Sequence, residues 1–378
     1  MTEATLIPDL PNKEVEGLSY FTPSQDPVAG STKTHTRDDE SPVPKLFEPL
    51  KIRDVKFQNR IFVSPMCQYS AQDGHLTHWH LSHLGGILMR GPGLTMIEAT
   101  AVLANGRITP NDSGLWQDSQ MDPLRMIVEF AHSQGQKIGI QLSHAGRKAS
   151  TVAPWLAGAS IATEKVGGWP SNVWGPSADA FTETMAKPIP VGKAEMDELK
   201  DAWAAATRRA VDVGFDVIEV HAAHGYLLSS FHSPAVNKRT DEYGGSLENR
   251  TRLTREIVRI TRENMPESMP LFVRVTATDW LEEDPDITES WTPDQTVELA
   301  ASLTDLGVDL IDVSSGGNHV LQHIHSRPGF QAPFATMVKK RVGDRSLVAT
   351  VGMITEGKLA NKLLEETGWM WSLQVVRS

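Results

Sequence analysis

The stretch VIEVHAAHGYLLSSFHSPAVNKRTDEYGGSLENR, residues 217–250, decides the fold that the sequence predicts. It opens with the apolar run 217–220, which is typical of a short buried strand. His221, His224 and Tyr226 follow at the point where this strand gives way to a loop. In an α/β barrel, the loops at the C-terminal ends of the strands build the active site. The stretch therefore predicts a barrel strand that carries two imidazoles and a phenol into a functional site.

The chemistry of these three side chains suits an oxygen atom and an adjoining carbon. Two neutral imidazole N–H groups can hold one carbonyl or phenolate oxygen, and a nearby phenol can deliver a proton to the neighbouring carbon. For an isolated H-x-x-H pattern, two structural histidines and a core tyrosine would be the better interpretation. The run N-x-R-x-D-x-Y-G-G-S-x-x-N-R at residues 237–250 favours the functional interpretation here.

These motifs, together with S-P-M-C-x-Y-S at residues 64–70, resemble the old yellow enzyme family of FMN-dependent ene-reductases. Within that family the H-A-A-H pattern is similar to the thermophilic-like branch, and the resemblance runs from near Pro44 to near Thr367. It implies FMN as the cofactor, NADPH or NADH as the co-substrate, and reduction of the activated C=C bond of an enone, enal, maleimide or nitroalkene. It also implies a small-molecule substrate and a homo-oligomer.

The composition limits the other function classes. The chain of 378 residues carries a net charge of −11, which argues against general binding of nucleic acid. A single cysteine, Cys67, excludes an intrachain disulfide and indicates a reducing compartment, so we expect a cytoplasmic protein. The N-terminus lacks the pattern of a secretory signal, and no run of about 18 apolar residues predicts a membrane span.

The chain divides into an arm and a barrel. Residues 1–44 are rich in Pro, Ser, Thr and charge, which predicts a flexible arm with a short docked piece at residues 18–21. Residues 45–378 alternate strands and helices, which implies a parallel sheet with crossover helices. The predicted strands are 60–64, 95–98, 137–142, 216–220, 271–275, 310–313 and 347–350, and the predicted helices are 122–134, 195–213, 247–263, 293–306, 331–341 and 355–366. We predict an FMN-binding (β/α)₈ TIM barrel; a Rossmann fold is the alternative, although no G-x-G-x-x-G follows any strand.

The eighth strand of this barrel is expected to be missing or altered. The chain reads GWMWSLQVVRS from Gly368 to Ser378, and Trp-Met-Trp is unusual for a barrel strand. By resemblance, the family's eighth strand ends in Gly-Arg, which holds the FMN phosphate, and this segment lacks it. Read in another frame, the codons allow Leu-Asp-Val-Val-Ala-Ala-Gly-Arg-Ser-Phe, so we expect a frameshift or mis-assigned splice junction near Gly368; a divergent C-terminus is the alternative. Such a truncated chain would be poorly soluble, retain little FMN, and be weakly active or inactive.

Polar or small side chains at the ends of successive strands predict a flavin site. The pyrimidine edge of a flavin suits the amide of Gln141, and its N1–C2 region, anionic on reduction, suits Arg274. Glycine-rich turns let backbone N–H groups approach a phosphate. With the contacts that the resemblance implies, the predicted FMN-binding residues are Ser64, Pro65, Met66, Cys67, Ala99, Gln141, Arg274, Gly316 and Gly352. The alternative for Gln141 and Arg274 is an ordinary buried polar pair.

The resemblance also assigns roles around the substrate. His221 and His224 would grip its carbonyl oxygen, Tyr226 would protonate its α-carbon, and Tyr69 would hydrogen-bond to it. The thiol of Cys67 would lie near the flavin and tune its redox potential. Hydride would pass from the nicotinamide to the flavin and then to the β-carbon in one shared pocket, with ping-pong kinetics.

Two features leave alternatives open. His78, His80 and His83 could indicate a metal-dependent barrel hydrolase, but they lie in a probable helix start and lack a lysine or aspartate partner at a strand end, so we expect no metal. The long connection 150–189 holds three tryptophans among Pro and Gly. It either caps the substrate or forms a packed surface loop.

Overall fold

Eight parallel strands close into a barrel in the computed structural model, which describes residues 11–32, 42–367 and 370–373. Around the barrel the order is β10, β11, β12, β3, β4, β5, β8 and β9. Their bounds are β3 (Ile61–Val63), β4 (Leu94–Ala101), β5 (Ile138–Ser143), β8 (Val217–Ala222), β9 (Leu271–Thr276), β10 (Leu310–Ser314), β11 (Leu347–Thr350) and β12 (Met370–Leu373). The predicted (β/α)₈ fold is confirmed, and each of the predicted strands is present within a few residues.

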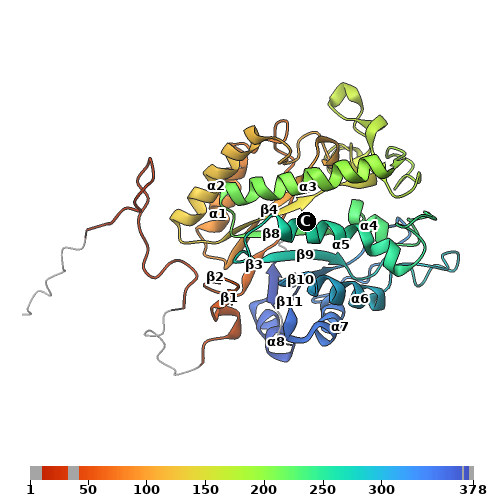
Figure 1. The fold of residues 1–378 in the computed structure, drawn as a ribbon. Helices are drawn as coiled ribbons and strands as arrows, with labels where there is room; N and C mark the ends of the chain where they lie inside the picture. Colours follow the sequence, from red (N-terminus) through yellow and green to blue (C-terminus); the bar gives the residue numbers. More distant parts are fainter. Residues whose placement is uncertain (1–10, 33–41, 368–369, 374–378) are drawn as a thin grey trace, which may run out of the picture.

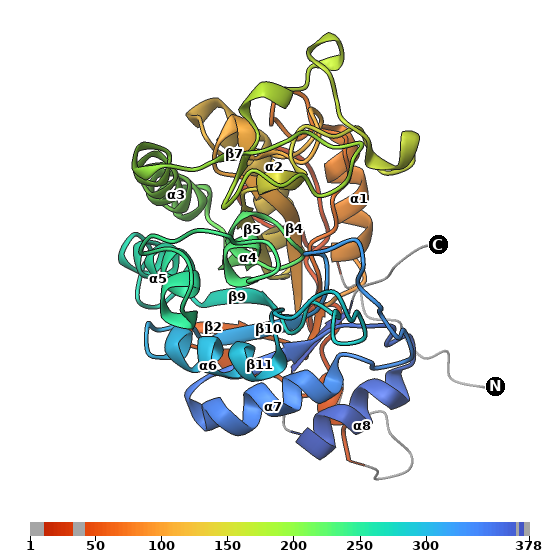
Figure 2. The ribbon, with the colours of Figure 1, turned by 90° about the vertical axis from the view of Figure 1, so that its right-hand side faces the viewer.

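Helices surround these strands and cover their outer face (Figure 1). Figure 2 views the barrel from the side on which the loops after β8, β9 and β10 gather. The helices are α1 (His78–Leu88), α2 (Met121–Ser133), α3 (Lys193–Val213), α4 (Leu227–His232), α5 (Leu247–Glu263), α6 (Pro293–Thr304), α7 (Ala332–Val342) and α8 (Gly357–Thr367). The six predicted helices are confirmed, and α4 is an additional short helix that directly follows the H-A-A-H-G-Y turn.

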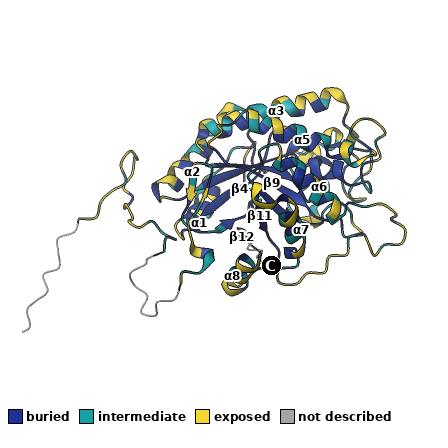
Figure 3. Ribbon diagram, turned by 60° about the horizontal axis from the view of Figure 1, so that its bottom comes forward, coloured by how far each residue is buried: buried dark blue, intermediate teal, exposed yellow. Residues whose placement is uncertain are grey.

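Helix α3 shows why these residues form this layer. Its buried positions recur every three or four residues, so one stripe of the helix faces the sheet and the opposite side is exposed to solvent (Figure 3). Glu195 accepts the N–H of Gly192 at 2.8 Å and caps the first turn. Gly214 ends the helix in the left-handed conformation, with φ of 98°.

Two short pairs of strands lie outside the barrel sheet. The hairpin of β1 (Leu50–Ile52) and β2 (Val55–Phe57) precedes the first barrel strand. Phe57 at its end is fully buried, and its ring lies 4.9 Å from the ring of Phe62 on β3. This hairpin therefore plugs the end of the barrel at which the strands begin. At the other end, β6 (Trp174–Gly175) pairs with β7 (Ile189–Pro190) within the long connection.

The eighth strand was expected to be missing or altered, and the first of these alternatives is wrong for the described residues, which form a short strand there. Met370 and Trp371 pair with β11, and the following residues pair with β3, so the backbone of β12 closes the circle. The side chains of this segment are unusual for a barrel strand, but closure depends on backbone N–H and C=O groups that an open edge would leave unpaired. The strand is four residues long, against eight in β4. The frame change placed near Gly368 and the final residues 374–378 lie outside the described residues.

The N-terminal arm docks on the barrel through residues 22–31, which we call the N-terminal clasp. Gln136 donates through Nε2 to the carbonyl oxygen of Ala29 at 3.2 Å, and Gln134 donates to Thr22 Oγ1 at 2.9 Å. Asn59, 1% exposed, donates through Nδ2 to the carbonyl oxygens of Gly30 and Gly91, at 3.1 and 2.8 Å.

The two backbones touch so closely that a side chain on Gly30 would collide. A Cβ there would lie 1.8 Å from the carbonyl oxygen of Gly91. The docked piece expected at residues 18–21 is therefore displaced along the chain, since Tyr20 and Phe21 are 49% and 58% exposed. Residues 1–10 and 33–41 of the predicted arm are outside the described ranges.

Removing the amide that holds the clasp should destabilise the barrel. Asn59→Ala leaves two carbonyl oxygens without their buried donor, which typically costs about 1–3 kcal/mol. We expect a lower thermal midpoint for Asn59→Ala, measured by circular dichroism. Gln25→Ala, an exposed position in the same segment, is the matched control and should change stability by less than about 0.5 kcal/mol. Equal midpoints for Asn59→Ala and the parent chain would show that the clasp holds nothing together.

Candidate active site

The end of β8 turns sharply into α4 and carries the predicted catalytic side chains with it. His224 adopts the left-handed conformation with φ of 62°, and Gly225 follows with φ of 72°. The N–H of His224 donates to Thr276 Oγ1 at 2.8 Å, which fixes the strained residue to β9. A Cβ on Gly225 would lie 2.0 Å from the carbonyl oxygen of Gly317, so only glycine lets the loops after β8 and β10 meet.

His221, His224 and Tyr226 form one cluster, as the sequence predicted. The ring of His221 lies 4.9 Å from that of Tyr226 and 5.3 Å from that of His224, at 89° and 90°. Each contact places an edge against a face, so ring nitrogens and the phenol can point to a common space. The arrangement brings together two imidazoles and a proton-bearing oxygen at the mouth of the barrel.

Both imidazoles are neutral near pH 7. Burial, with smaller effects from neighbouring cations, lowers the pKa of His224 to about 3 and the pKa of His221 well below its ordinary value. His221 Nδ1 accepts the N–H of Ala223 at 3.3 Å, so its ring proton sits on Nε2. His224 Nε2 lies 2.7 Å from Ser314 Oγ. When that hydroxyl donates, His224 carries its proton on Nδ1, and each ring keeps one N–H to offer.

Tyr226 is the third member of the cluster and holds its proton tightly. Burial raises the pKa of its phenol well above the ordinary value, and Cys67 and Tyr69 raise it further. The ring packs against a small apolar cluster that includes Ala145 and Val173. The phenol is therefore an O–H donor throughout the neutral range and not a phenolate.

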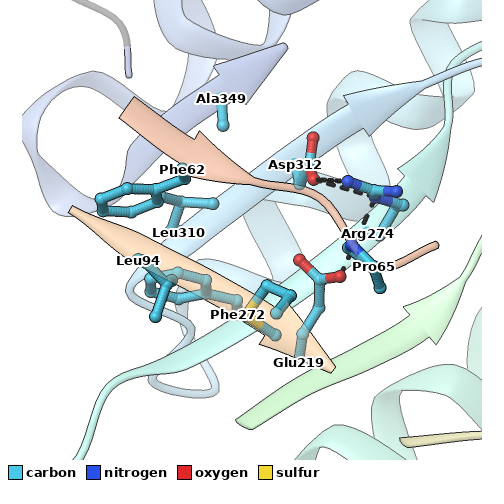
Figure 4. Close-up of a pocket in the computed structure, with 10 residues that line it drawn as sticks. Phe62, Pro65, Leu94, Glu219, Phe272, Arg274, Leu310, Asp312 and Ala349 are labelled. Atoms are coloured by element: carbon cyan, nitrogen blue, oxygen red, sulfur yellow. Dashed lines mark hydrogen bonds and ion pairs between the residues drawn. The ribbon is translucent and has the colours of Figure 1, made fainter. Parts of the chain in front are cut away.

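Below this cluster, three predicted flavin residues, Ser64, Gln141 and Arg274, lie in one polar layer inside the barrel. Figure 4 shows Arg274 of this layer with Asp312 and Glu219. Arg274 donates through Nη2 to Ser64 Oγ at 3.0 Å and through Nε to Asp312 Oδ2 at 2.8 Å. Gln141 donates through Nε2 to Glu219 Oε1 at 2.7 Å. The donor set of hydroxyl, amide and guanidinium fits the polar edge of a flavin. Sequence reasoning missed Glu219 and Asp312, whose signal was a single acid inside each apolar run, V-I-E-V and L-I-D-V.

The segment after β3 is anchored from the neighbouring strand. The register of β4 shifts at Glu98, and this bulge residue accepts the N–H of Gln68 through Oε1 at 3.2 Å. The anchor lies between Cys67 and Tyr69 in the chain. Burial raises the pKa of the Cys67 thiol, and the nearby carboxyls of Asp112 and Glu98 raise it further, so Cys67 is a neutral thiol.

Tyr69 lies beneath the long connection after β5. It holds a left-handed φ of 51°, and the Trp155 ring stands 5.4 Å away at 81°. Trp155 is 68% exposed and touches the ring that is predicted to bind substrate. Trp174 in the same connection is buried and stacks on His144 at 5.3 Å. The connection thus has a packed base and a tip over the site, which favours the capping interpretation.

Lys148 is a site residue that the prediction left out. Its Nζ donates to the carbonyl oxygen of His224 at 2.8 Å and lies 4.1 Å from the centre of the Phe181 ring. Burial, and then Arg147, lowers the pKa of Lys148 to about 7. Within the described ranges no carboxylate forms an ion pair with it. The signal was the G-R-K run after the third predicted strand.

Comparison with known proteins decides the family. The model of the "NADH:flavin oxidoreductase / NADH oxidase family" of FMN-binding oxidoreductases matches residues 45–370. The chain belongs to this family.

Relatives within and around this flavin oxidoreductase family agree. An NADH:flavin oxidoreductase of Gibberella zeae is 54% identical over 362 residues, which cover 94% of this chain and 86% of the relative. An NADPH dehydrogenase of Bacillus subtilis is 41% identical over 323 residues, 85% of this chain and 87% of the relative. The fold is shared with morphinone reductase (TM-score 0.71, 23% identity, 88% and 86% covered) and with an Old Yellow Enzyme from Pichia sp. (TM-score 0.71, 23% identity, 88% and 83% covered).

The flavin oxidoreductase is therefore an enzyme of the old yellow enzyme type, with FMN as cofactor and a nicotinamide as co-substrate. The resemblance predicted from the motifs is confirmed. Gln141, Arg274 and Ser64 are the residues whose chemistry fits the ring system of FMN. Ala99 pairs with Gln141 across β4 and β5, and Pro65 lines the same interior space as Arg274.

The predicted phosphate turns fit the flavin less directly. Gly316 and Gly352 follow the adjacent strands β10 and β11. The N–H of Gly316 donates to the carbonyl oxygen of Thr278 at 2.9 Å, and the carbonyl oxygen of Gly352 accepts the N–H of Gly329 at 2.9 Å. The N–H of Gly316 is already used in a hydrogen bond within the protein, so a contact between this N–H and the FMN phosphate stays a prediction. The contacts of Met66 with FMN also stay a prediction.

Of the three histidines near residue 80, His80 has a structural role in this enzyme. His80 Nδ1 accepts the N–H of Thr77 at 3.0 Å and caps α1, and its Nε2 lies 3.6 Å from Glu98 Oε2. Among the described residues, no three His, Cys, Asp or Glu side chains gather as a metal site. No helix in the described part of the chain has the length and apolar character needed to cross a membrane.

Proposed function

We propose that this flavin oxidoreductase reduces the activated C=C bond of a small α,β-unsaturated carbonyl compound, using NADPH or NADH. One observation supports it above the others: two neutral imidazoles and a protonated phenol share one corner of the barrel mouth, with ring centres about 5 Å apart. A carbonyl oxygen held by two N–H donors would have its adjoining carbons within reach of the phenol. FMN, when bound, accepts hydride from the nicotinamide and passes it to the β-carbon.

The side chains then divide the remaining work. His221 donates from Nε2 and His224 from Nδ1 to the substrate oxygen, which gains negative charge as the β-carbon receives hydride. Because both rings are neutral, they stabilise this charge as fixed dipoles and do not give up their protons. Tyr226 delivers its proton to the α-carbon, and Tyr69 hydrogen-bonds to the substrate from the opposite loop.

Surroundings of the site support exclusion of water during this step. Trp155 stands over Tyr69, and Phe181 covers the ammonium of Lys148. The homo-oligomeric state and a cytoplasmic location are further parts of this proposal that rest on the sequence. A weakly active or inactive chain is the alternative that the test below also addresses.

The test separates flavin binding from the reaction. The purified chain is mixed with FMN, washed, and its visible spectrum recorded; NADPH is then added without oxygen, followed by 2-cyclohexenone. We expect a yellow protein that bleaches with NADPH and recovers its colour with the enone, with the saturated ketone as product. A flavin that bleaches but is not reoxidised by enones, enals, maleimides or nitroalkenes would contradict C=C reduction. A chain that takes up no FMN would support the inactive alternative.

A further inference from the structure

The barrel interior is built in three layers, and its middle layer is charged. Along β8, Val217, Glu219 and His221 alternate with outward-facing residues, as the two-residue period of a strand requires. Val217 belongs to an apolar floor that includes Phe272 and Leu310. His221 belongs to the candidate active site above. Glu219 therefore lies between the floor and the site, at a depth where it is 2% exposed.

This middle layer contains more acid than base. Arg274 and Asp312 face each other in the register of β9 and β10, and Glu219 faces Gln141 in the register of β5 and β8. Two carboxyl groups thus share a single guanidinium in a dry interior. Burying an unpaired charge costs far more free energy than burying a paired one. The protonated, neutral form of one of the two carboxyl groups is therefore favoured.

Geometry identifies Glu219 as that acid. Asp312 receives hydrogen bonds from both Nε and Nη2 of Arg274. Glu219 lies 3.9 Å from Nε and otherwise accepts the amide of Gln141. Burial raises the pKa of Glu219 to about 7; Arg274 lowers it and Asp312 raises it, and both effects are smaller than that of burial. Its proton is therefore exchanged in the physiological range.

The ionised form of this carboxyl has room for little water beside it. The cavity beneath the layer, bounded by Glu219, Asp312 and the ring of Phe272, has a volume of about 10 Å³ (Figure 4). A cavity of that size holds about one water molecule. A negative charge on Glu219 therefore acts mainly on its two polar neighbours, the amide of Gln141 and the guanidinium of Arg274. Both groups are predicted to contact FMN.

We propose that Glu219 is a positioning residue that takes up a proton when FMN is reduced and releases it when FMN is oxidised. Hydride transfer brings two electrons and one proton to bound FMN and leaves one extra negative charge beside Arg274. An ionised Glu219 opposes that charge and weakens the effect of Arg274. Protonation of Glu219 from solvent removes the opposition, so flavin reduction and proton uptake favour each other. Glu219 also holds the amide of Gln141 in a fixed orientation, with Nε2 turned toward the carboxyl.

The inference rests on FMN lying against Gln141 and Arg274, and does not depend on which substrate is reduced. Its test is a slow redox titration of the FMN-loaded protein against a reference dye, across the pH range on both sides of neutrality. In the parent protein, the midpoint potential should fall more steeply with pH between the pKa of Glu219 beside oxidised FMN and its higher pKa beside reduced FMN than on either side of that window.

Glu219→Gln keeps the shape of the side chain and mimics the protonated acid. Near pH 8.5 this variant should favour reduced over oxidised FMN about tenfold more than the parent, the value of about one pKa unit of coupling, and near pH 5.5 by less than about threefold. The matched control is Glu129→Gln, the same change on an exposed position of α2, which should follow the parent at every pH.

Two outcomes would overturn the proposal. One is a parent protein whose potential has a single slope through neutrality. The other is a change of slope that persists in Glu219→Gln, because it would then belong to the cofactor. If Glu219→Gln fails to fold, the parent titration still decides the first outcome. Failure to reduce an enone would leave these measurements valid, so it would count against the proposed function alone.

Discussion

Replacing Tyr226 by phenylalanine is expected to slow flavin reoxidation by an enone about 10²–10⁴-fold, while reduction by NADPH stays nearly unchanged. The variant keeps the ring that packs at 4.9 Å against His221 and loses only the O–H. The buried phenol has a raised pKa and is fully protonated at neutral pH, so the loss removes a proton donor and no charge. Hydride transfer into the flavin needs no proton from this residue.

Anaerobic stopped-flow spectroscopy of the two half-reactions measures the effect. Tyr243→Phe is the matched control, because that phenol bonds to Glu256 and Lys200 on the outer helices. We expect Tyr243→Phe to resemble the parent in both half-reactions. Equal slowing of reduction and reoxidation in Tyr226→Phe would assign the residue to packing and remove it from the proton-transfer step.

Truncation of His221 should weaken phenol binding and slow C=C reduction by about 10²–10³-fold, the usual loss when one oxyanion donor is removed. The backbone N–H of Ala223 fixes the tautomer of this ring, so the donor is already directed before substrate arrives. Because the ring stays neutral down to low pH, phenol affinity in the parent should show no step near pH 6.5, the ordinary histidine pKa.

His221→Ala is measured by titration of a phenol against the flavin absorbance and by steady-state reduction of an enone. His78→Ala, an exposed position at the start of α1, serves as the control and should leave both unchanged. Normal phenol binding together with normal turnover in His221→Ala would place the oxygen grip elsewhere in the site.

Strands and helices with strong apolar patterns were predictable from the sequence. The runs at residues 271–275 and 310–313 match β9 and β10 within one residue, since their short length and their position between helices favour buried strands. The functional interest of Asp312 was not predicted, because a single acidic residue in an apolar strand does not by itself indicate a site. Its inward direction follows from alternation, but its partner on the next strand depends on register, which the sequence does not state.

Contacts between distant segments could not be predicted. The N-terminal clasp is held largely by hydrogen bonds to backbone carbonyl oxygens. Every residue has such an oxygen, so the amino-acid sequence does not reveal these contacts. The presence of strand β12 was missed for a related reason, because it pairs with β11 and β3 through its backbone, which its side chains do not reveal. The cluster of His221, His224 and Tyr226 was predicted well because it comes from one short, continuous stretch.

The N-terminal clasp also bears on the order in which the chain assembles. Thr22 is synthesised early, but its partner Gln134 lies 112 residues later in the chain. Gln136, the partner of Ala29, lies 107 residues after Ala29. At about 5–20 residues per second, synthesis separates these pairs by roughly 5–20 seconds, whereas Asn59, which binds the carbonyl oxygen of Gly30, follows 29 residues after it. We expect contacts between such distant positions to form after the folding transition state, and contacts of that kind mainly slow unfolding. We therefore expect the clasp to slow the unfolding of the barrel and to have little effect on the rate at which the barrel folds.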